Sequence, residues 1–128
     1  MTFVDTSVVM YAVGRPHPLK PEAEAFFESA LRERTPLGTS AEVLQELLHA
    51  YLPAGRLETL DAALELVESL VDTVWPVEPD DVLLARSLVG RHPTLQARDL
   101  LHLATCRRRG VDDIKTFDRP LASALRRR

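Results

Sequence analysis

Hydrophobic positions along the chain follow two patterns, short β-prone runs and longer stripes with helical spacing. Leu57, Leu60, Leu64 and Val67 recur every three or four residues, which predicts an amphipathic helix. The run from Thr2 to Val4 ends at a polar turn and is typical of a strand. On the same grounds, strands are predicted at 2–4, 36–39, 73–77 and 114–117. Helices are predicted at 8–13, 22–34, 41–52, 56–72, 79–91, 98–109 and 121–125.

Strands and helices alternate along the chain, and this order predicts the class of fold. It is typical of α/β proteins, in which helices cover both faces of a central parallel sheet, giving three layers, α/β/α. No repeat, low-complexity segment or linker divides the sequence, so residues 1–128 are expected to form a single domain. Ligands of such folds bind beyond the carboxyl ends of the strands, and Asp5 and Asp118 are predicted to lie there.

Four acidic residues stand out because they lie at the ends of predicted elements or on the polar side of an apolar helix: Asp5, Glu46, Asp99 and Asp118. Carboxylates that a fold brings together form sites for hard divalent cations, which take oxygen ligands. Each acid also has an ordinary alternative role. Asp5 and Asp118 can act as turn or cap residues, and Asp99 can interact with a helix dipole. Glu46 can be a solvated surface residue.

Local capping patterns help to rank the acidic residues. The two hydroxyl residues after Asp5 can cap the next helix, which leaves the Asp5 carboxylate available for a site. The stretch Thr39-Ser40-Ala41-Glu42 matches a capping box, which employs the carboxylate of Glu42. Glu46 has no such local partner, so Glu46 rather than Glu42 is predicted to belong to the site.

The net charge of the chain does not by itself favour binding to nucleic acid. The formal net charge is −3, although divalent cations bound to the acidic residues would offset it. The arginine run at 107–109 is predicted to be a solvated helix end. The run at 126–128 is predicted to be a frayed tail, with contact to a phosphate backbone as its alternative. Asp80 and Asp81, directly after Pro79, are assigned to the dipole of their own helix.

The composition predicts a cytoplasmic protein with no membrane segment. The first residues lack the basic region of a signal peptide, and no apolar stretch approaches the roughly 20 residues of a membrane span. Cys106 is the single cysteine and cannot form an internal disulfide.

Other chemistries find little support in the sequence. The histidines do not form a zinc-ligand spacing with Cys106, and His102 is predicted to be a surface or core-edge residue. There is no Walker loop, dinucleotide-binding glycine pattern or G-x-S-x-G elbow.

Four short motifs in order along the chain carry a family resemblance. They are Phe3-Val4-Asp5-Thr6-Ser7, Ser40 six residues before Glu46, Ala97-Arg98-Asp99-Leu100-Leu101, and Thr116-Phe117-Asp118-Arg119. Together they resemble the PIN-domain nucleases, and most closely the VapC-like toxins of toxin–antitoxin pairs. The resemblance covers essentially the whole chain. Many members of the family carry a further acidic or aromatic residue where this chain continues with Arg119, Pro120 and Leu121.

The resemblance implies cleavage of RNA that depends on Mg²⁺ or Mn²⁺. It implies a quartet of Asp5, Glu46, Asp99 and Asp118, supported by hydroxyl groups of Thr6 and Thr116. Within the quartet, Asp5, Asp99 and Asp118 are expected to be metal ligands, and Glu46 to ligate metal or orient the attacking water. The family is commonly dimeric and is silenced by a small antitoxin.

Two other functions are possible for the chain, and one surface is predicted to bind a partner. The chain could be a catalytically silent PIN-like module that binds RNA or protein, which the intact quartet argues against. It could also be a phosphatase with Asp5 as nucleophile, but that chemistry usually needs an acid two residues on, where Ser7 stands. An antitoxin helix is expected to contact Leu48, Tyr51 and Leu52, with burial in the core as the alternative for all three.

Overall fold

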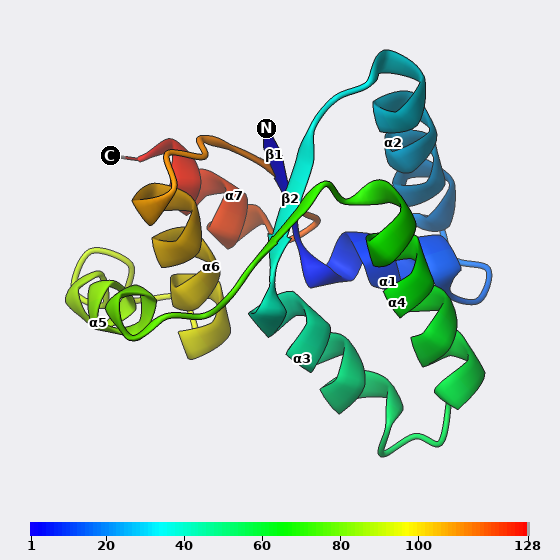
Figure 1. Ribbon diagram of the computed structural model, residues 1–128. Helices are drawn as coiled ribbons and strands as arrows, with labels where there is room; N and C mark the ends of the chain where they lie inside the picture. Colours follow the sequence, from blue (N-terminus) through cyan, green and yellow to red (C-terminus); the bar gives the residue numbers. More distant parts are fainter. Residues whose placement is uncertain (128) are drawn as a thin grey trace.

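A four-stranded parallel sheet lies at the centre of the molecule, with strand order β3-β2-β1-β4 (Figure 1). The computed structural model describes residues 1–127. Within this range the strands are β1 (Thr2–Val4), β2 (Leu37–Ser40), β3 (Thr73–Trp75) and β4 (Asp113–Lys115). The predicted parallel sheet is therefore confirmed, although β3 and β4 each end two residues earlier than predicted.

Helices cover both faces of the sheet, which confirms the predicted three-layer α/β/α architecture (Figure 1). The helices described in residues 1–127 are α1 (Thr6–Val13), α2 (Lys20–Glu33), α3 (Ala41–Tyr51), α4 (Leu57–Leu70), α5 (Pro79–Ser87), α6 (Ala97–Arg108) and α7 (Arg119–Arg126). Helices α1, α2 and α4 lie on one side, and α5, α6 and α7 lie on the other. Helix α3 leaves the end of β2 and contacts α1, α4 and α6. No helix in this range is long and apolar enough to cross a bilayer.

The connections between strands create a crevice beside β1. The chain runs outward from β1 to β2 and β3, then returns through α5 and α6 to place β4 on the other side of β1. Helices α1 and α7, which follow β1 and β4, consequently lie on opposite sides of the sheet (Figure 1). Such a reversal opens a crevice at the carboxyl ends of the two strands. Asp5 and Asp118 are the residues at that position, as the sequence predicts.

Strand β1 is enclosed on both faces, which fixes the position of the residue that follows it. Phe3 and Val4 point to opposite faces because side chains alternate along a strand, and both are fully buried. Phe3 packs against the ring of His102 on α6, with 5.5 Å between the ring centroids. In β2, Gly38 pairs with Phe3, and a Cβ atom at Gly38 would lie 2.6 Å from the ring of Trp75. Glycine therefore permits the close packing of Trp75 on β2.

The helices begin and end within two residues of the predicted bounds, except at the end of α5. Helix α7 begins at Arg119 because the side chain of Asp118 accepts a hydrogen bond from the backbone N–H of Leu121, and Pro120 occupies the first turn. Helix α5 ends at Ser87 rather than at residue 91, because the chain leaves the helix in a series of turns that carry it toward α6.

The arginine run at the end of α6 binds α5 and is not the solvated helix end that the sequence predicts. Asp81 is fully buried, and its Oδ1 atom accepts hydrogen bonds from Arg108 at 2.8 Å and from Arg109 at 2.6 Å. Arg107 donates to the backbone carbonyl of Ala124 on α7. Burial opposes ionisation of Asp81, but hydrogen bonds from Arg109 and the backbone of Glu78 lower its pKa to about 2. Asp81 therefore joins two helices, beyond the dipole role predicted for it.

Asp81→Asn is expected to lower the free energy of unfolding by about 2–3 kcal/mol at neutral pH, because charged hydrogen bonds to two arginines are lost. The pKa is lowered in the folded state, so this stabilisation is complete above the ordinary value of 3.8 and disappears as the pH falls through about 2. Urea unfolding at neutral pH and near pH 2 measures both effects. Asp80→Asn is the matched control, because the Asp80 side chain is exposed and lies 3.9 Å from Arg108. Equal losses in the two variants would contradict the assignment.

Candidate active site

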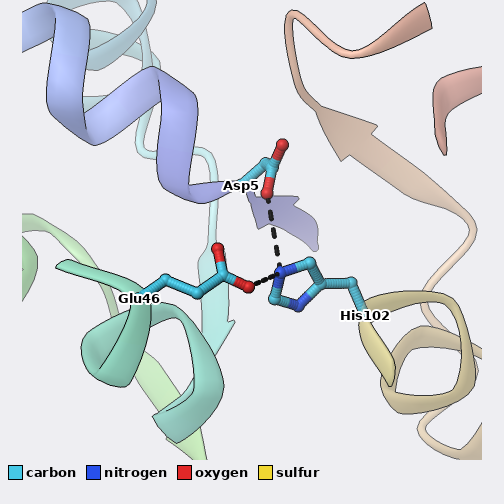
Figure 2. A group of neighbouring side chains, drawn as sticks. All are labelled: Asp5, Glu46 and His102. Carbon is cyan, nitrogen blue, oxygen red and sulfur yellow. Dashed lines mark hydrogen bonds and ion pairs between the residues drawn. The ribbon is translucent and has the colours of Figure 1, made fainter. Parts of the chain in front are cut away.

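Three ionisable side chains from distant parts of the chain meet at the carboxyl end of β1 (Figure 2). Asp5 follows β1, Glu46 lies on α3 and His102 lies on α6. The Nε2 atom of His102 is 2.8 Å from Oε1 of Glu46 and 3.7 Å from Oδ1 of Asp5. One potential ligand atom from each residue lies within 4.8 Å of the others. All three side chains are buried, so their charges interact in a medium of low polarity.

Asp5 combines a capping role with a place in this cluster. Its Oδ1 atom accepts a hydrogen bond of 2.8 Å from the backbone N–H of Thr6, so Asp5 itself caps α1. The prediction that the hydroxyl residues after Asp5 supply this cap is therefore wrong. The other carboxylate oxygen, Oδ2, accepts a hydrogen bond of 2.6 Å from the hydroxyl of Thr116. One carboxylate oxygen is thus held by the backbone just after β1, and the other by a hydroxyl group just after β4.

Glu46 is buried, with 8% of its surface exposed, and is not the solvated residue of the alternative prediction. The hydroxyl of Thr6 donates to its Oε2 atom, and His102 bonds its Oε1 atom. Burial alone would raise the pKa of Glu46, but the hydrogen bond and charge of His102 lower it overall. Glu46 is therefore held as a carboxylate that faces the cluster.

The capping box predicted for Glu42 does not form. Helix α3 begins one residue later than that pattern requires, with Ser40 as its cap residue and no hydrogen bond from the Ser40 side chain. Glu42 is half-buried, and its pKa is raised by burial and by the neighbouring charge of Glu46. The capping role predicted for Glu42 is therefore wrong, although Glu42 does not line the cleft described below.

His102 is the residue that the sequence did not identify. Its side chain is 1% exposed, contrary to the predicted surface or core-edge position. Burial alone would lower its pKa, but the hydrogen bond that it donates to Glu46 and the charges of Glu46 and Asp5 raise it. The sequence contains one indication that His102 belongs to the site. His102 lies among Leu100, Leu103 and Ala104, and a histidine on a buried helix face needs a polar partner.

Asp99 and Asp118 complete the group of acidic residues around one open cleft of about 460 Å³. Asp5 and Glu46 line the same cleft, so the structure brings together all four acids that the sequence predicted. Asp99 also forms a capping box with Gln96, and Asp118 caps α7. The pKa of Asp99 is raised by burial and then by the charges of Asp118 and Asp5. The ordinary capping roles and a place in the cleft are therefore compatible.

The two predicted supporting hydroxyl groups bind the acidic residues directly. Thr6 donates to Glu46, as described above. Thr116 donates to Asp5, and its oxygen accepts a hydrogen bond of 2.9 Å from the backbone N–H of Asp118. Thr116 thereby links the carboxyl ends of β1 and β4 and fixes the distance between two of the acids.

The residues present fit a divalent cation. Carboxylate oxygens are the ligands that hard cations take. Burial, and then repulsion by Asp118 and Asp5, raises the pKa of Asp99, and a cation would relieve that repulsion. His102 adds one nitrogen atom beside two of the carboxylates. Arg98 also lines the cleft and brings positive charge to its rim.

The predicted partner-binding residues divide between surface and core. Leu48 is 45% exposed and Leu52 is 55% exposed, so both can contact a partner. Tyr51 is only 3% exposed and packs in the core beneath Arg56, whose guanidinium lies 5.5 Å from the ring centroid. Tyr51 therefore lies on the inner side of α3, as its core alternative predicts, and its contact with an antitoxin stays a prediction.

Comparison with known proteins identifies the family of this chain. The PIN domain family matches residues 2–124, and the chain belongs to that family. The chain is 61% identical over 126 residues to ribonuclease VapC23 of Mycobacterium tuberculosis, which covers 98% of this chain and 99% of that protein. It is 41% identical over 119 residues to ribonuclease VapC13 of the same species, covering 93% and 91%. Within the PIN-domain family, the chain is a VapC-like toxin ribonuclease.

Solved structures show the same fold at lower identity. The crystal structure of VapC20 from Mycobacterium tuberculosis, described as a sarcin–ricin loop cleaving toxin, has a TM-score of 0.80 and 22% identity. That comparison covers 97% of this chain and 95% of VapC20. FitAcB from Neisseria gonorrhoeae has a TM-score of 0.67 and 22% identity, covering 98% and 93%.

Proposed function

We propose that this chain is an endoribonuclease toxin in which Asp5, Glu46, Asp99 and Asp118 form a metal-dependent active site. The observation that carries the proposal is the meeting of Asp5, Glu46 and His102 at the carboxyl end of the central strand (Figure 2). The extended similarity to ribonuclease VapC23 supports the reaction class. A silent binding module would have no need of four carboxylates in one cleft, since their repulsion costs stability.

The proposed roles follow from position and chemistry. Asp5, Asp99 and Asp118 hold Mg²⁺ or Mn²⁺, because a set of hard oxygen ligands favours these ions. A cation held there would stabilise negative charge on the phosphoryl oxygens and would lower the pKa of the attacking water. Glu46 ligates the cation or orients the attacking water, while Thr6 and Thr116 hold the carboxylates in place.

A panel of short RNAs incubated with Mg²⁺, Mn²⁺ or EDTA tests the proposal. We expect cleavage with either cation and none in EDTA. Cleavage that is equally fast in EDTA would exclude the metal-dependent reaction. Binding without cleavage under every condition would favour the silent module.

We also propose that a small antitoxin silences the enzyme by covering the acidic cleft. An arginine of the partner suits this cleft, because its guanidinium bonds carboxylates bidentately. An apolar helix of the partner would contact Leu48 and Leu52 on the outer side of α3, next to the cleft residues His49 and Ala50.

The double variant Leu48→Glu, Leu52→Glu is expected to abolish a stable complex with the co-expressed antitoxin, because two charges enter an apolar contact. Both side chains are exposed, so the variant should fold. Leu31→Glu is the matched control, because Leu31 is 66% exposed and lies on α2. Co-purification of the two proteins gives the readout. A complex that survives the double variant, or that is lost equally in the control, places the antitoxin elsewhere.

We propose further that the toxin is a homodimer that acts in the cytoplasm. Exposed Val82 and Val89 line an apolar pocket between α5 and α6, which is a suitable surface for a second copy. Light scattering of the purified toxin measures the mass. A mass near 14.3 kDa would show a monomer and contradict the proposal.

A further inference from the structure

A second cleft, of about 330 Å³, continues from the acidic site along α1. Ser7 and Met10 line both clefts, so the two are neighbours with a shared wall. Ser7, Met10, Tyr11 and Gly14 follow one another at helical spacing and form a single stripe that leads away from Asp5. A strand of substrate that places a phosphate at the acids can therefore continue directly into this second cleft.

The walls of the second cleft present flat rings and cations. The ring of Tyr11 lies 4.5 Å from the ring of His17 and 5.4 Å from that of Phe117. Across the cleft, the guanidinium of Arg56 covers Tyr51. Unpaired RNA bases stack on such aromatic rings and on guanidinium planes.

The loop that forms the outer wall of this cleft is held in place. Lys20 donates hydrogen bonds to the carbonyl oxygens of Ala12 at 2.8 Å and Gly14 at 2.9 Å, which ties the loop to the end of α1. The backbone N–H of Leu19 donates to Nδ1 of His17 at 3.0 Å. The proton of the neutral His17 ring is therefore on Nε2, where it remains a donor for a ligand.

The charge of the second cleft is opposite to that of the acidic site. Arg15 and Arg56 line it, and no aspartate or glutamate is among the residues that form its wall. A ligand that suits it has a flat apolar part and a negative charge. A nucleotide has both.

We infer that this cleft, formed by Tyr11, Arg15, His17, Tyr51 and Arg56, binds the nucleotide next to the bond that is cleaved. The base stacks against the Tyr11–His17 wall, and the arginines contact its phosphate. The inference rests on the proposed ribonuclease function, because it assigns the cleft to the substrate of that reaction. The positive charge of Arg15 and Arg56 favours RNA as the occupant over an antitoxin segment, because the antitoxin is proposed to bring a basic side chain of its own.

The variants His17→Ala and Arg15→Ala test the inference, because both side chains are exposed and neither belongs to the acidic site. With a single-stranded oligoribonucleotide and Mn²⁺, we expect each to lower kcat/KM by about tenfold, the effect of losing one stacking or phosphate contact. With bis(p-nitrophenyl) phosphate, which is too small to span both clefts, we expect wild-type rates. Arg32→Ala on α2 is the control for loss of one exposed charge and should change neither rate.

Binding of a fluorescent oligoribonucleotide in EDTA separates this inference from the proposed function. If the wild type fails to cleave RNA, the proposed function fails, and anisotropy in EDTA still tests the cleft. Oligonucleotide affinity and cleavage equal to wild type in both variants would overturn the inference. Loss of antitoxin binding with unchanged RNA binding and cleavage would also overturn it, by assigning the cleft to the partner.

Discussion

Asp5→Asn is expected to lower the rate of RNA cleavage by about 100-fold or more and to weaken Mn²⁺ binding by a similar factor. The reason is that Asp5 lies at the centre of the acidic cleft and carries one of the negative charges that a cation needs. Asparagine keeps the side-chain oxygen that accepts the Thr6 N–H, and it is as good a helix cap as aspartate. The fold should therefore survive while the chemistry is lost.

Calorimetric titration with Mn²⁺ and single-turnover cleavage measure the two losses. Asp61→Asn is the matched control, because Asp61 is an exposed aspartate on α4 and the substitution removes the same charge outside the cleft. Asp5→Ala adds a second comparison, since it removes the cap as well and should cost about 1 kcal/mol of stability. Unchanged Mn²⁺ affinity in Asp5→Asn would remove Asp5 from the metal site.

The sequence was informative about the fold because each strand and helix carries its own local pattern. Short apolar runs, helical stripes and turn residues predicted every element described here, with errors mostly at the ends. The alternation of strands and helices predicted the parallel order of the strands. That order in turn predicted that Asp5 and Asp118 lie beyond the carboxyl ends of the strands. The positions of Asp5 and Asp118 at element boundaries therefore contained real information about the cleft.

Capping patterns were less informative about where helices begin, because the same four residues are compatible with more than one first residue of the helix. The stretch from Thr39 to Glu42 matches a capping box, yet the helix begins at Ala41 and the box does not form. The boxes that do form use Glu78 and Gln96 as cap residues, which are not among the preferred caps. Tertiary packing decides where a helix begins, and a pattern of four residues contains no information about that packing.

The missed residues depend on contacts between distant segments. His102 and Glu46 are 56 positions apart, and they meet because α6 and α3 both reach the end of β1. Asp81 and Arg109 meet across α5 and α6 in the same way. The sequence contains a buried histidine and a run of arginines, but it does not show which carboxylate each one faces.

Glu46→Gln and Glu42→Gln form the second decisive comparison, because the two glutamates lie one turn apart on α3 and differ in their contacts. Glu46 accepts hydrogen bonds from Thr6 and His102 inside the acidic cluster, whereas Glu42 does not line the cleft. Glutamine at 46 retains an acceptor for His102 but removes the charge. We therefore expect a loss of about 100-fold or more in kcat with a folded protein.

Glu42→Gln should keep cleavage within about twofold of wild type, as for a surface substitution away from the chemistry. It should also leave stability unchanged or slightly higher at neutral pH. The pKa of Glu42 is raised in the folded protein by burial and by Glu46, so its ionised form costs stability above its ordinary pKa. A neutral glutamine relieves that cost, and thermal unfolding at neutral pH measures it. If cleavage is lost in Glu42→Gln and kept in Glu46→Gln, the assignment of the fourth acid is reversed, and the contacts of Glu46 with Thr6 and His102 serve stability alone.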